Sequence, residues 1–436
     1  MTRRPPARSH FTCSVPACEA SAVASRSRRP DVVMDRPPPP PAPVRLLNAV
    51  GRRAGHRDRL DAEEMLWDAR RRTGLADLGP DTDQAYRLLV DAVDREARLT
   101  TLGRLVVGRL VRSHLARRLQ VVEALRQRPD LAVAPVRRPL FVVGLPRTGT
   151  TLLHNLLAQA DGSRPLLARD VVQPVPPVLR GAAYDTRGLR YWASVRGMYY
   201  LGPGRRRLHD YNAGPVECLR LLARSFVCFA FPNMVHVPSY ERWLWEQDGR
   251  ALVSAYELHR MQLQTLQADG RRGHWVLKAP AHLPALEALL TVYPDASVVL
   301  PHRSPATVVA SLSSLVARNH ALLAEEPDLS AVGREVLART LRTLERVERT
   351  RAALGDDRII DVGYRELLTD PVGAVRMIHE RIGHPLPPAS IERMRRWLAD
   401  NPQGKHGAHR YGLEQYGLDA ATVDRLTARY RTPFDG

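Results

Sequence analysis

The sequence has no long hydrophobic run. Its 436 residues contain no stretch of about 18 uncharged apolar residues, the length that a membrane-spanning helix needs. The nearest candidate, LRLLARSFVCFAF, carries Arg220 and Arg224 within it. The basic N-terminus lacks the apolar centre and the small-residue cleavage site of a secretory signal. We therefore predict no transmembrane helix and a cytoplasmic protein.

Cysteine is also scarce, with four residues in the whole chain. Their spacing fits neither a dense disulfide framework nor a zinc site made of paired C-x-x-C motifs. Free or structural thiols are the simpler interpretation, and no metal is predicted. The four residues are Cys13, Cys18, Cys218 and Cys228.

Acidic residues are too few to balance the basic ones, and the formal net charge is +19. Part of this excess lies in residues 1–60, which contain 12 Arg and four acidic residues. The sequence has no zinc finger, RNP-type aromatic motif or basic zipper, so the charge suits an anionic small ligand as well as a nucleic acid. No specific nucleic-acid partner is predicted, although a non-catalytic nucleotide-binding or RNA-binding protein stays an alternative.

Among the 65 basic residues only Lys278 and Lys405 are lysine. Lysine carries a compact point charge on a flexible stem, whereas arginine carries a planar fork. The two are not interchangeable at a tight phosphoryl-type site. These two positions are therefore candidates for function.

The chain divides into three parts. Residues 1–43 are rich in Arg, Ser and Pro without hydrophobic periodicity, which predicts a disordered tail; Met34 within it is a second candidate for the start of the protein. Residues 44–135 have apolar residues at spacings of three and four, which predicts a helical module that packs on the rest as a scaffold. Residues 136–436 form the predicted main domain.

From Arg138 onward buried strands alternate with helices, a pattern typical of a parallel sheet with helices on both faces. Residues 160–250 are richer in Pro, Tyr and Trp, and we expect irregular structure that forms a substrate pocket. The predicted strands are PLFVVGL, WVLKA, SVVLPHR and RIIDVGY, and the predicted helices cover residues 149–159, 283–292, 305–320, 330–354 and 371–382.

The first strand leads into a phosphate-binding loop. FVVGLPRTGTTLLHNLL meets the Walker A pattern, G-x-x-x-x-G-K-[ST], at Gly144, Gly149 and Thr151, but Thr150 stands in place of the lysine. Backbone N–H groups at the start of the following helix can bind an anion, and a donor without a triphosphate does not need that lysine. The predicted fold is therefore α/β and P-loop NTPase-like, with an N-terminal all-helical extension. The predicted cradle consists of Arg147, Thr148, Gly149, Thr150 and Thr151.

PRTGTTLLHNLL resembles the 5'-phosphosulfate loop of the sulfotransferases that use 3'-phosphoadenosine 5'-phosphosulfate (PAPS), in their bacterial branch. VVLPHRSPATVVASLSSL is similar to the 3'-phosphate site of the same family, in which a Ser follows the Arg by eight residues. Arg303 and Ser311 fill these places, and both can reach an anion near the helix N-terminus. The resemblance implies transfer of a sulfuryl group from PAPS to a hydroxyl or amine, with release of 3'-phosphoadenosine 5'-phosphate (PAP).

Two further segments extend the resemblance. VGYRELLTDP is similar to a family element that brings Tyr364 toward the adenine. GKHGAHR fits the C-terminal G-x-x-G-x-x-[KR] loop that folds over the 3'-phosphate, with Lys405, His406 and Arg410 as its cations.

WVLKAPAHL lies between the two phosphate motifs, where the family keeps a lysine close to a catalytic histidine. Sulfuryl transfer needs a base for the acceptor proton and cations for the charge on the leaving oxygen. We assign His282 as the base, and Lys278 and Arg147 as the cations. Glu217 is the second candidate for the base and Asp170 the third.

Other interpretations stay open at this point. A P-loop kinase would need the Walker lysine and an Asp for magnesium, and Thr150 argues against it. The sequence does not choose among a sugar, a lipid, a peptide tyrosine and a secondary metabolite as the acceptor, and it predicts no oligomeric state.

Overall fold

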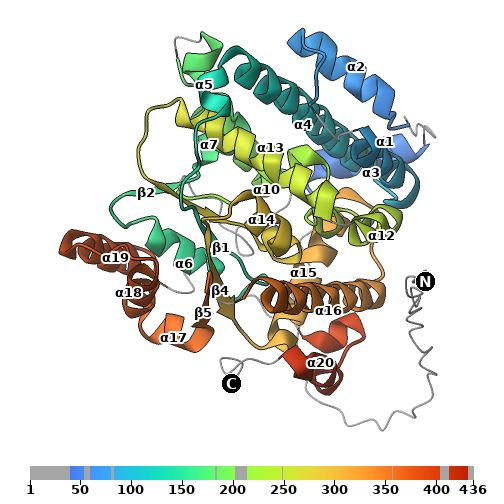
Figure 1. Ribbon diagram of the computed structural model, residues 1–436. Coiled ribbons are helices and arrows are strands. Elements are labelled where there is room, and N and C mark those ends of the chain that lie inside the picture. The colour runs from blue at the N-terminus through green and yellow to red at the C-terminus, as the bar shows by residue number, and fades with distance from the viewer. Residues whose placement is uncertain are drawn as a thin grey trace, which may run out of the picture. The chain divides into compact units, whose positions relative to one another are not determined.

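The computed structural model describes residues 40–53, 59–79, 83–181, 184–201, 214–247, 249–355, 357–402 and 412–430 (Figure 1). Most of the predicted tail, residues 1–39, lies outside these ranges. Within them, no helix is both long enough and apolar enough to cross a bilayer.

The described residues contain five parallel strands that form one sheet. The strand order is β2-β3-β1-β4-β5, so β1 is central. Val142 of β1 is in register with Lys278 of β3 and with Val299 of β4, which brings the carboxyl ends of these strands to one edge. Open α/β sheets bind ligands at this edge. The strands are β1 (Leu140–Val142), β2 (Ser163–Pro165), β3 (His274–Lys278), β4 (Ser297–His302) and β5 (Ile359–Gly363).

The central strands are apolar because helices cover both faces of the sheet. Val142 and Val276 belong to a hydrophobic cluster on one face, and Phe141 and Leu277 belong to a cluster on the other. Figure 1 shows α6, α18 and α19 on one side of the sheet and α13 and α14 on the other. These helices, with α17, are α6 (Thr150–Leu157), α13 (Gly249–Gln267), α14 (Leu286–Val292), α17 (Tyr364–Thr369), α18 (Pro371–Arg381) and α19 (Pro388–Asp400).

The N-terminal helices pack on the sheet's second face rather than forming a separate core. Leu115 and Leu119 of α4 lie in the same hydrophobic cluster as Phe141. The side chain of Thr100 caps α4 by accepting a hydrogen bond from the Gly103 N–H. This N–H lies in the first turn and has no acceptor within the helix itself. The helices are α1 (Ala42–Arg53), α2 (Ala62–Thr73), α3 (Asp83–Glu96), α4 (Thr101–Gln127) and α5 (Pro129–Ala132).

The described residues between β2 and β3 are mainly helical, although we expected an irregular insertion. Buried polar contacts fix them to the core: Arg224 donates to the Gln262 side chain of α13 at 2.7 Å, and the Tyr240 hydroxyl donates to the Phe226 carbonyl at 2.7 Å. The elements before α13 are α7 (Ala168–Val172), η1 (Pro177–Arg180), α8 (Arg187–Leu201), α10 (Leu219–Leu222), η2 (Ala223–Ser225), α11 (Phe231–Met234) and α12 (Pro238–Glu246).

The four predicted strands are present, and the five predicted helices are observed with shifted boundaries. Strand β2 was not predicted because its three residues, Ser-Arg-Pro, show no apolar pattern; it pairs only with β3 at the edge. The remaining elements are η3 (Pro280–Ala285), α15 (Pro305–Leu323), α16 (Leu329–Leu354), η4 (Leu413–Tyr416), α20 (Ala420–Thr427) and η5 (Ala428–Tyr430).

Candidate active site

The predicted phosphate loop joins β1 to α6 at the ligand-binding edge of the sheet. Arg147 has φ 72° and Gly149, the N-cap of α6, has φ 90°. A non-glycine residue in this region is strained, and such strain is often found at binding sites. The Thr148 hydroxyl donates to the Leu145 carbonyl at 2.8 Å and closes the loop on itself. The loop therefore places the N-terminus of α6, whose first N–H groups can bind an anion, directly after β1.

Gly149 permits a close approach between the loop and α17. A Cβ atom built at this position would lie 2.7 Å from Leu367 Cδ2 and 3.3 Å from Tyr364 Cδ2. Tyr364 begins α17 directly after β5, so the fold places its ring against the loop. This contact brings two of the predicted binding residues together.

Arg303 lies at the end of β4 and joins the same group. Its Nη1 donates to the Arg147 carbonyl at 2.8 Å, and its guanidinium lies 4.2 Å from the centre of the Tyr364 ring. Ser311 lies in the second turn of α15 and is 6% exposed. The structure thus brings Arg147, Arg303 and Tyr364 together at the carboxyl edge of β1, β4 and β5.

Lys278 places an ammonium group beside the loop. It ends β3, and its register with Val142 places it beside the beginning of the loop. Its Nζ donates to the Thr151 hydroxyl at 3.3 Å and to Glu217 Oε1 at 2.5 Å. Lys278 is 2% exposed, and a buried ammonium ion needs such partners to offset its lost hydration. The lysine therefore reaches the phosphate loop from the neighbouring strand.

Glu217 is held in place by its backbone neighbours. The Val216 N–H donates to the Leu166 carbonyl at 2.9 Å, and the Cys218 N–H donates to the Lys278 carbonyl at 2.9 Å. The Glu217 side chain is 19% exposed, so a ligand at the sheet edge can reach it. Of the candidate bases, Glu217 is the one that contacts both the lysine and, through it, the loop.

His282, the first candidate for the base, lies in η3 with its ring in the core. It is 0% exposed, its Nδ1 lies 2.8 Å from the Tyr256 hydroxyl, and its ring meets the edge of Phe141. Burial holds its pKa well below the usual value, so the imidazole is neutral. The structure does not bring this ring into contact with the Glu217–Lys278 pair, and its catalytic role stays a prediction.

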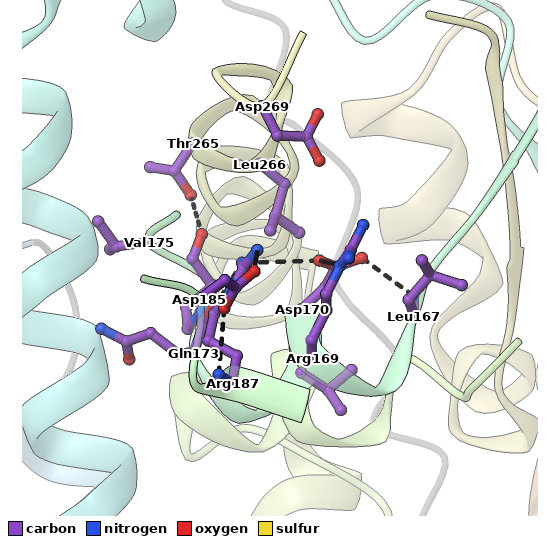
Figure 2. Close-up of polar contacts among 12 residues, drawn as sticks. Leu167, Arg169, Asp170, Gln173, Val175, Asp185, Arg187, Thr265, Leu266 and Asp269 are labelled. Atoms are coloured by element: carbon purple, nitrogen blue, oxygen red, sulfur yellow. Dashed lines mark hydrogen bonds and ion pairs between the residues drawn. The ribbon is translucent and has the colours of Figure 1, made fainter. Parts of the chain in front are cut away.

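Asp170, the third candidate, belongs to a network of arginines (Figure 2). Its Oδ2 accepts from the Leu167 N–H and from Arg271, both at 3.0 Å, and Arg187 lies 3.7 Å from its Oδ1. The carboxylate is 0% exposed. The enclosed charge links α7 to α8 and to the segment that follows α13, and it is not open to an acceptor.

The three cations predicted to cover the 3'-phosphate are not part of this geometry. Lys405, His406 and Arg410 lie in residues 403–411, outside the described part of the chain.

Comparisons with known proteins identify the family of the chain. The model of the sulfotransferase family matches residues 139–388, which include the loop, Lys278, Glu217 and Arg303. The chain therefore belongs to the sulfotransferase family. This confirms the bacterial, PAPS-dependent sulfotransferase predicted from its motifs.

Two solved structures resemble most of the chain. Sulfotransferase STF9 from Mycobacterium avium is 32% identical with a TM-score of 0.76, and the match covers 86% of this chain and 97% of STF9. Sulfotransferase STF1 from Mycobacterium tuberculosis is 32% identical with a TM-score of 0.74, and covers 86% of this chain and all of STF1.

Among curated proteins, omega-hydroxy-beta-dihydromenaquinone-9 sulfotransferase Stf3 from Mycobacterium bovis is 26% identical over 297 residues, which is 67% of this chain and 74% of Stf3.

Sequence reasoning missed two contacts that organise the site. The Glu217–Lys278 pair joins residues 61 positions apart, and the Arg303–Tyr364 contact joins the ends of two different strands. Two signals pointed to Lys278, the rarity of lysine and the resemblance of WVLKAPAHL to the family's lysine–histidine segment.

Proposed function

We propose that this sulfotransferase uses Glu217 as its general base, Lys278 as its principal cation, and a hydroxyl of an apolar, lipid-like molecule as its acceptor. The observation that carries the proposal is the position of Lys278 Nζ, 2.5 Å from the Glu217 carboxylate and 3.3 Å from the Thr151 hydroxyl of the phosphate loop. The ammonium group thus lies between the base and the anion site.

This arrangement couples the two halves of the reaction. The acceptor hydroxyl gives its proton to Glu217 as its oxygen bonds to sulfur, and the bond from sulfur to the bridging phosphate oxygen breaks. The negative charge then moves from the base to the leaving oxygen. Protonation of Glu217 removes its attraction for Lys278, so the ammonium can stabilise the new charge together with the loop N–H groups.

The binding of the donor follows from the cluster at the strand ends. The loop and α6 N-terminus suit the 5'-phosphosulfate, and Arg303 with Ser311 suits the 3'-phosphate. Tyr364 packs against Arg303 and offers an aromatic face for the adenine. We keep Lys405, His406 and Arg410 as a proposed cover for the 3'-phosphate.

An apolar acceptor is supported by the surface of α8. Leu189, Trp192 and Tyr200 are 73%, 45% and 58% exposed, and Arg190 and Arg196 are exposed beside them. Exposed apolar and basic side chains on one helix suit an amphipathic molecule or an anionic lipid surface.

The buried side of α8 packs close to Glu217, the proposed base. Tyr191 and Val195 are buried in a small cluster against which Val216 packs, and Val216 directly precedes Glu217. The relative Stf3 is named for an acceptor of the same kind, a hydroxylated dihydromenaquinone.

The experiment is a PAP-release assay with PAPS in detergent micelles. The acceptor is a long isoprenoid alcohol, its short, water-soluble homologue or a sugar, and a parallel assay offers ATP in place of PAPS. We expect turnover with the long alcohol at least tenfold above that with the short one. Equal turnover with the short alcohol or with a sugar would overturn the acceptor class. Absence of PAP with every acceptor, together with hydrolysis of ATP, would overturn the reaction itself.

Two exposed tryptophans provide a matched control for the role of α8. Trp192→Ser should raise the KM for the long alcohol severalfold with little change in kcat. Trp67→Ser, which changes a 58% exposed tryptophan on α2, should leave both constants unchanged. The same effect from both substitutions would remove α8 from the proposal.

A further inference from the structure

A second group of chemically reactive side chains includes residues that closely follow Glu217 and Lys278 in the sequence. Cys218 follows Glu217, and His282 follows Lys278 by four residues; both meet His259 of α13. The Cys218 sulfur and one ring nitrogen from each histidine all lie within 4.8 Å of one another. All three residues are 0% exposed. Two imidazoles and a thiol are therefore enclosed together in the core.

The hydrogen bonds of the two histidines leave one nitrogen of each free. His282 Nδ1 lies 2.8 Å from the Tyr256 hydroxyl, and His259 Nδ1 lies 2.8 Å from the Tyr293 hydroxyl. The Nε2 atoms of both rings are buried and have no hydrogen-bond partner within the described residues. A buried polar atom without a partner costs about 1–3 kcal/mol, so two in one cluster need an explanation.

We propose that Cys218, His259 and His282 bind a thiophilic metal cation, Zn²⁺ or Cu⁺, through the sulfur and the two Nε2 atoms. Thiolate and imidazole are the donors that these ions prefer. Bonds of about 2.0–2.3 Å would hold the three donors roughly 3.3–3.8 Å apart. The donors lie within 4.8 Å of one another, so they need to approach by at most about 1.5 Å.

The surroundings of the cluster are those of a metal site. A metal-bound histidine almost always donates its other ring N–H to an oxygen, which fixes the orientation of the ring. The tyrosine hydroxyls of Tyr256 and Tyr293 supply that oxygen here.

The ion would brace the catalytic pair without touching the substrates. It would tie the chain after Glu217 to η3, which follows β3, and to α13. The Cys218 N–H already donates to the Lys278 carbonyl at 2.9 Å, so a fixed Cys218 also fixes the end of β3. The three ligands are therefore positioning residues, and their metal binding is independent of which acceptor the enzyme uses.

The test measures metal binding by the full-length protein with Cys13 and Cys18 changed to Ser, which removes the thiols of the tail. The chelator-treated protein is titrated anaerobically with Zn²⁺, with Cu⁺, and with Co²⁺, whose bond to a thiolate gives a charge-transfer absorption band. We expect one ion per chain and that band with Co²⁺. Failure of all three ions to bind would overturn the proposal.

Cys228 gives a matched control, because it is also a buried free thiol. Cys228→Ser should bind the metal as before, whereas Cys218→Ser should bind it at least 100-fold more weakly and lose the cobalt band. Equal binding by both variants would contradict the assignment.

X-ray absorption of the metal-loaded parent protein, in which these ligands are unchanged, provides a measurement that does not depend on the folding of a variant. One sulfur and two imidazole nitrogens in the coordination shell support the site, and a shell of oxygen alone overturns it.

Discussion

Glu217 and Cys218 are neighbours in the sequence, and Lys278 precedes His282 by four residues, but the two members of each pair meet different partners. The Glu217 and Lys278 side chains meet at the edge of the sheet beside the phosphate loop, where a carboxylate 19% exposed can reach a ligand. The Cys218 and His282 side chains meet in the core at 0% exposure. The two short segments, residues 217–218 and 278–282, therefore form two groups of side chains with different chemistry, one at the sheet edge and one in the core.

The comparison of these two groups shows that the chemical role of a titratable side chain depends on its hydrogen-bond partners and on its access to solvent. Lys278 is nearly as buried as His282, but it keeps a carboxylate and a hydroxyl as partners. His282 has one tyrosine hydroxyl and aromatic rings, and its pKa is lowered accordingly. Of the two sites, the one at the sheet edge is therefore suited to proton transfer, and the one in the core is suited to holding structure.

The largest expected effect is a loss of turnover that tells whether Glu217 or His282 is the base. Glu217→Gln keeps the size of the side chain but removes the base, so kcat should fall by roughly 10²- to 10⁴-fold while PAP affinity changes little. Steady-state kinetics and calorimetry with PAP measure the two quantities. If Glu217→Gln stays active and His282→Ala loses its turnover, the histidine is the base and the comparison above is wrong.

The next effect concerns the nucleotide. Arg303→Ala removes the charge-assisted contact that we propose for the 3'-phosphate, so PAP affinity should fall by roughly 10- to 100-fold while ADP affinity changes much less. Calorimetry with both nucleotides measures this difference. Arg365→Ala, at an exposed position on the adjacent helix α17, is the control and should leave PAP affinity unchanged. Equal losses for PAP and ADP would place Arg303 at a phosphate that both nucleotides share.

A pair of glycines tests the packing of the phosphate loop. Gly149 and Gly162 both have positive φ, 90° and 75°, but of the two only Gly149 has neighbours within 4 Å of the position that a Cβ atom would take. Both substitutions to Ala incur about 1 kcal/mol of backbone strain, and Gly149→Ala should be roughly 1 kcal/mol less stable again because of Leu367. Urea unfolding measures both. Equal losses of unfolding free energy in the two variants would show that α17 can move away from the added methyl group without loss of stability.

The effect that is smallest at neutral pH, and that grows on acidification, comes from a third buried histidine near the site. Burial and Lys278 lower the pKa of His154 to about 3, below its unfolded value near 6.5. Between these values the unfolded chain binds a proton that the folded chain does not, so stability is lost as pH falls. The slope for this one group is about 1.4 kcal/mol per pH unit.

Urea unfolding between pH 7 and pH 4 should therefore show a shallower decline for His154→Gln than for the wild type. His236 has the opposite sign, because Glu335 raises its pKa, so its contribution is lost as pH rises. His236→Gln should make the decline on acidification steeper. An unchanged slope in His154→Gln would mean that this ring is protonated in the folded protein.

Much of the fold could be predicted because its signals are local. Each predicted strand is a short apolar run, and each predicted helix has its own periodicity. The pairs Arg147 with Thr148 and Arg303 with Ser311 lie within a few residues of each other. The three-residue strand β2 and the helices between residues 163 and 267 were missed, because edge pairing and buried arginine contacts such as Arg224 with Gln262 leave no pattern in the sequence.

The sequence by itself determined the sulfotransferase family and the positions of the two phosphate motifs, because a strand, a turn and a helix N-terminus follow one another directly along the chain. Only the tertiary structure decided which groups those motifs meet. The register of β3 against β1 places Lys278 beside the loop, and Glu217 reaches it from 61 residues away. Packing on α13 turns Cys218 and His282 into the core toward His259. Such directions depend on strand register and on the filling of a shared core, and neither is written in the local order of residues.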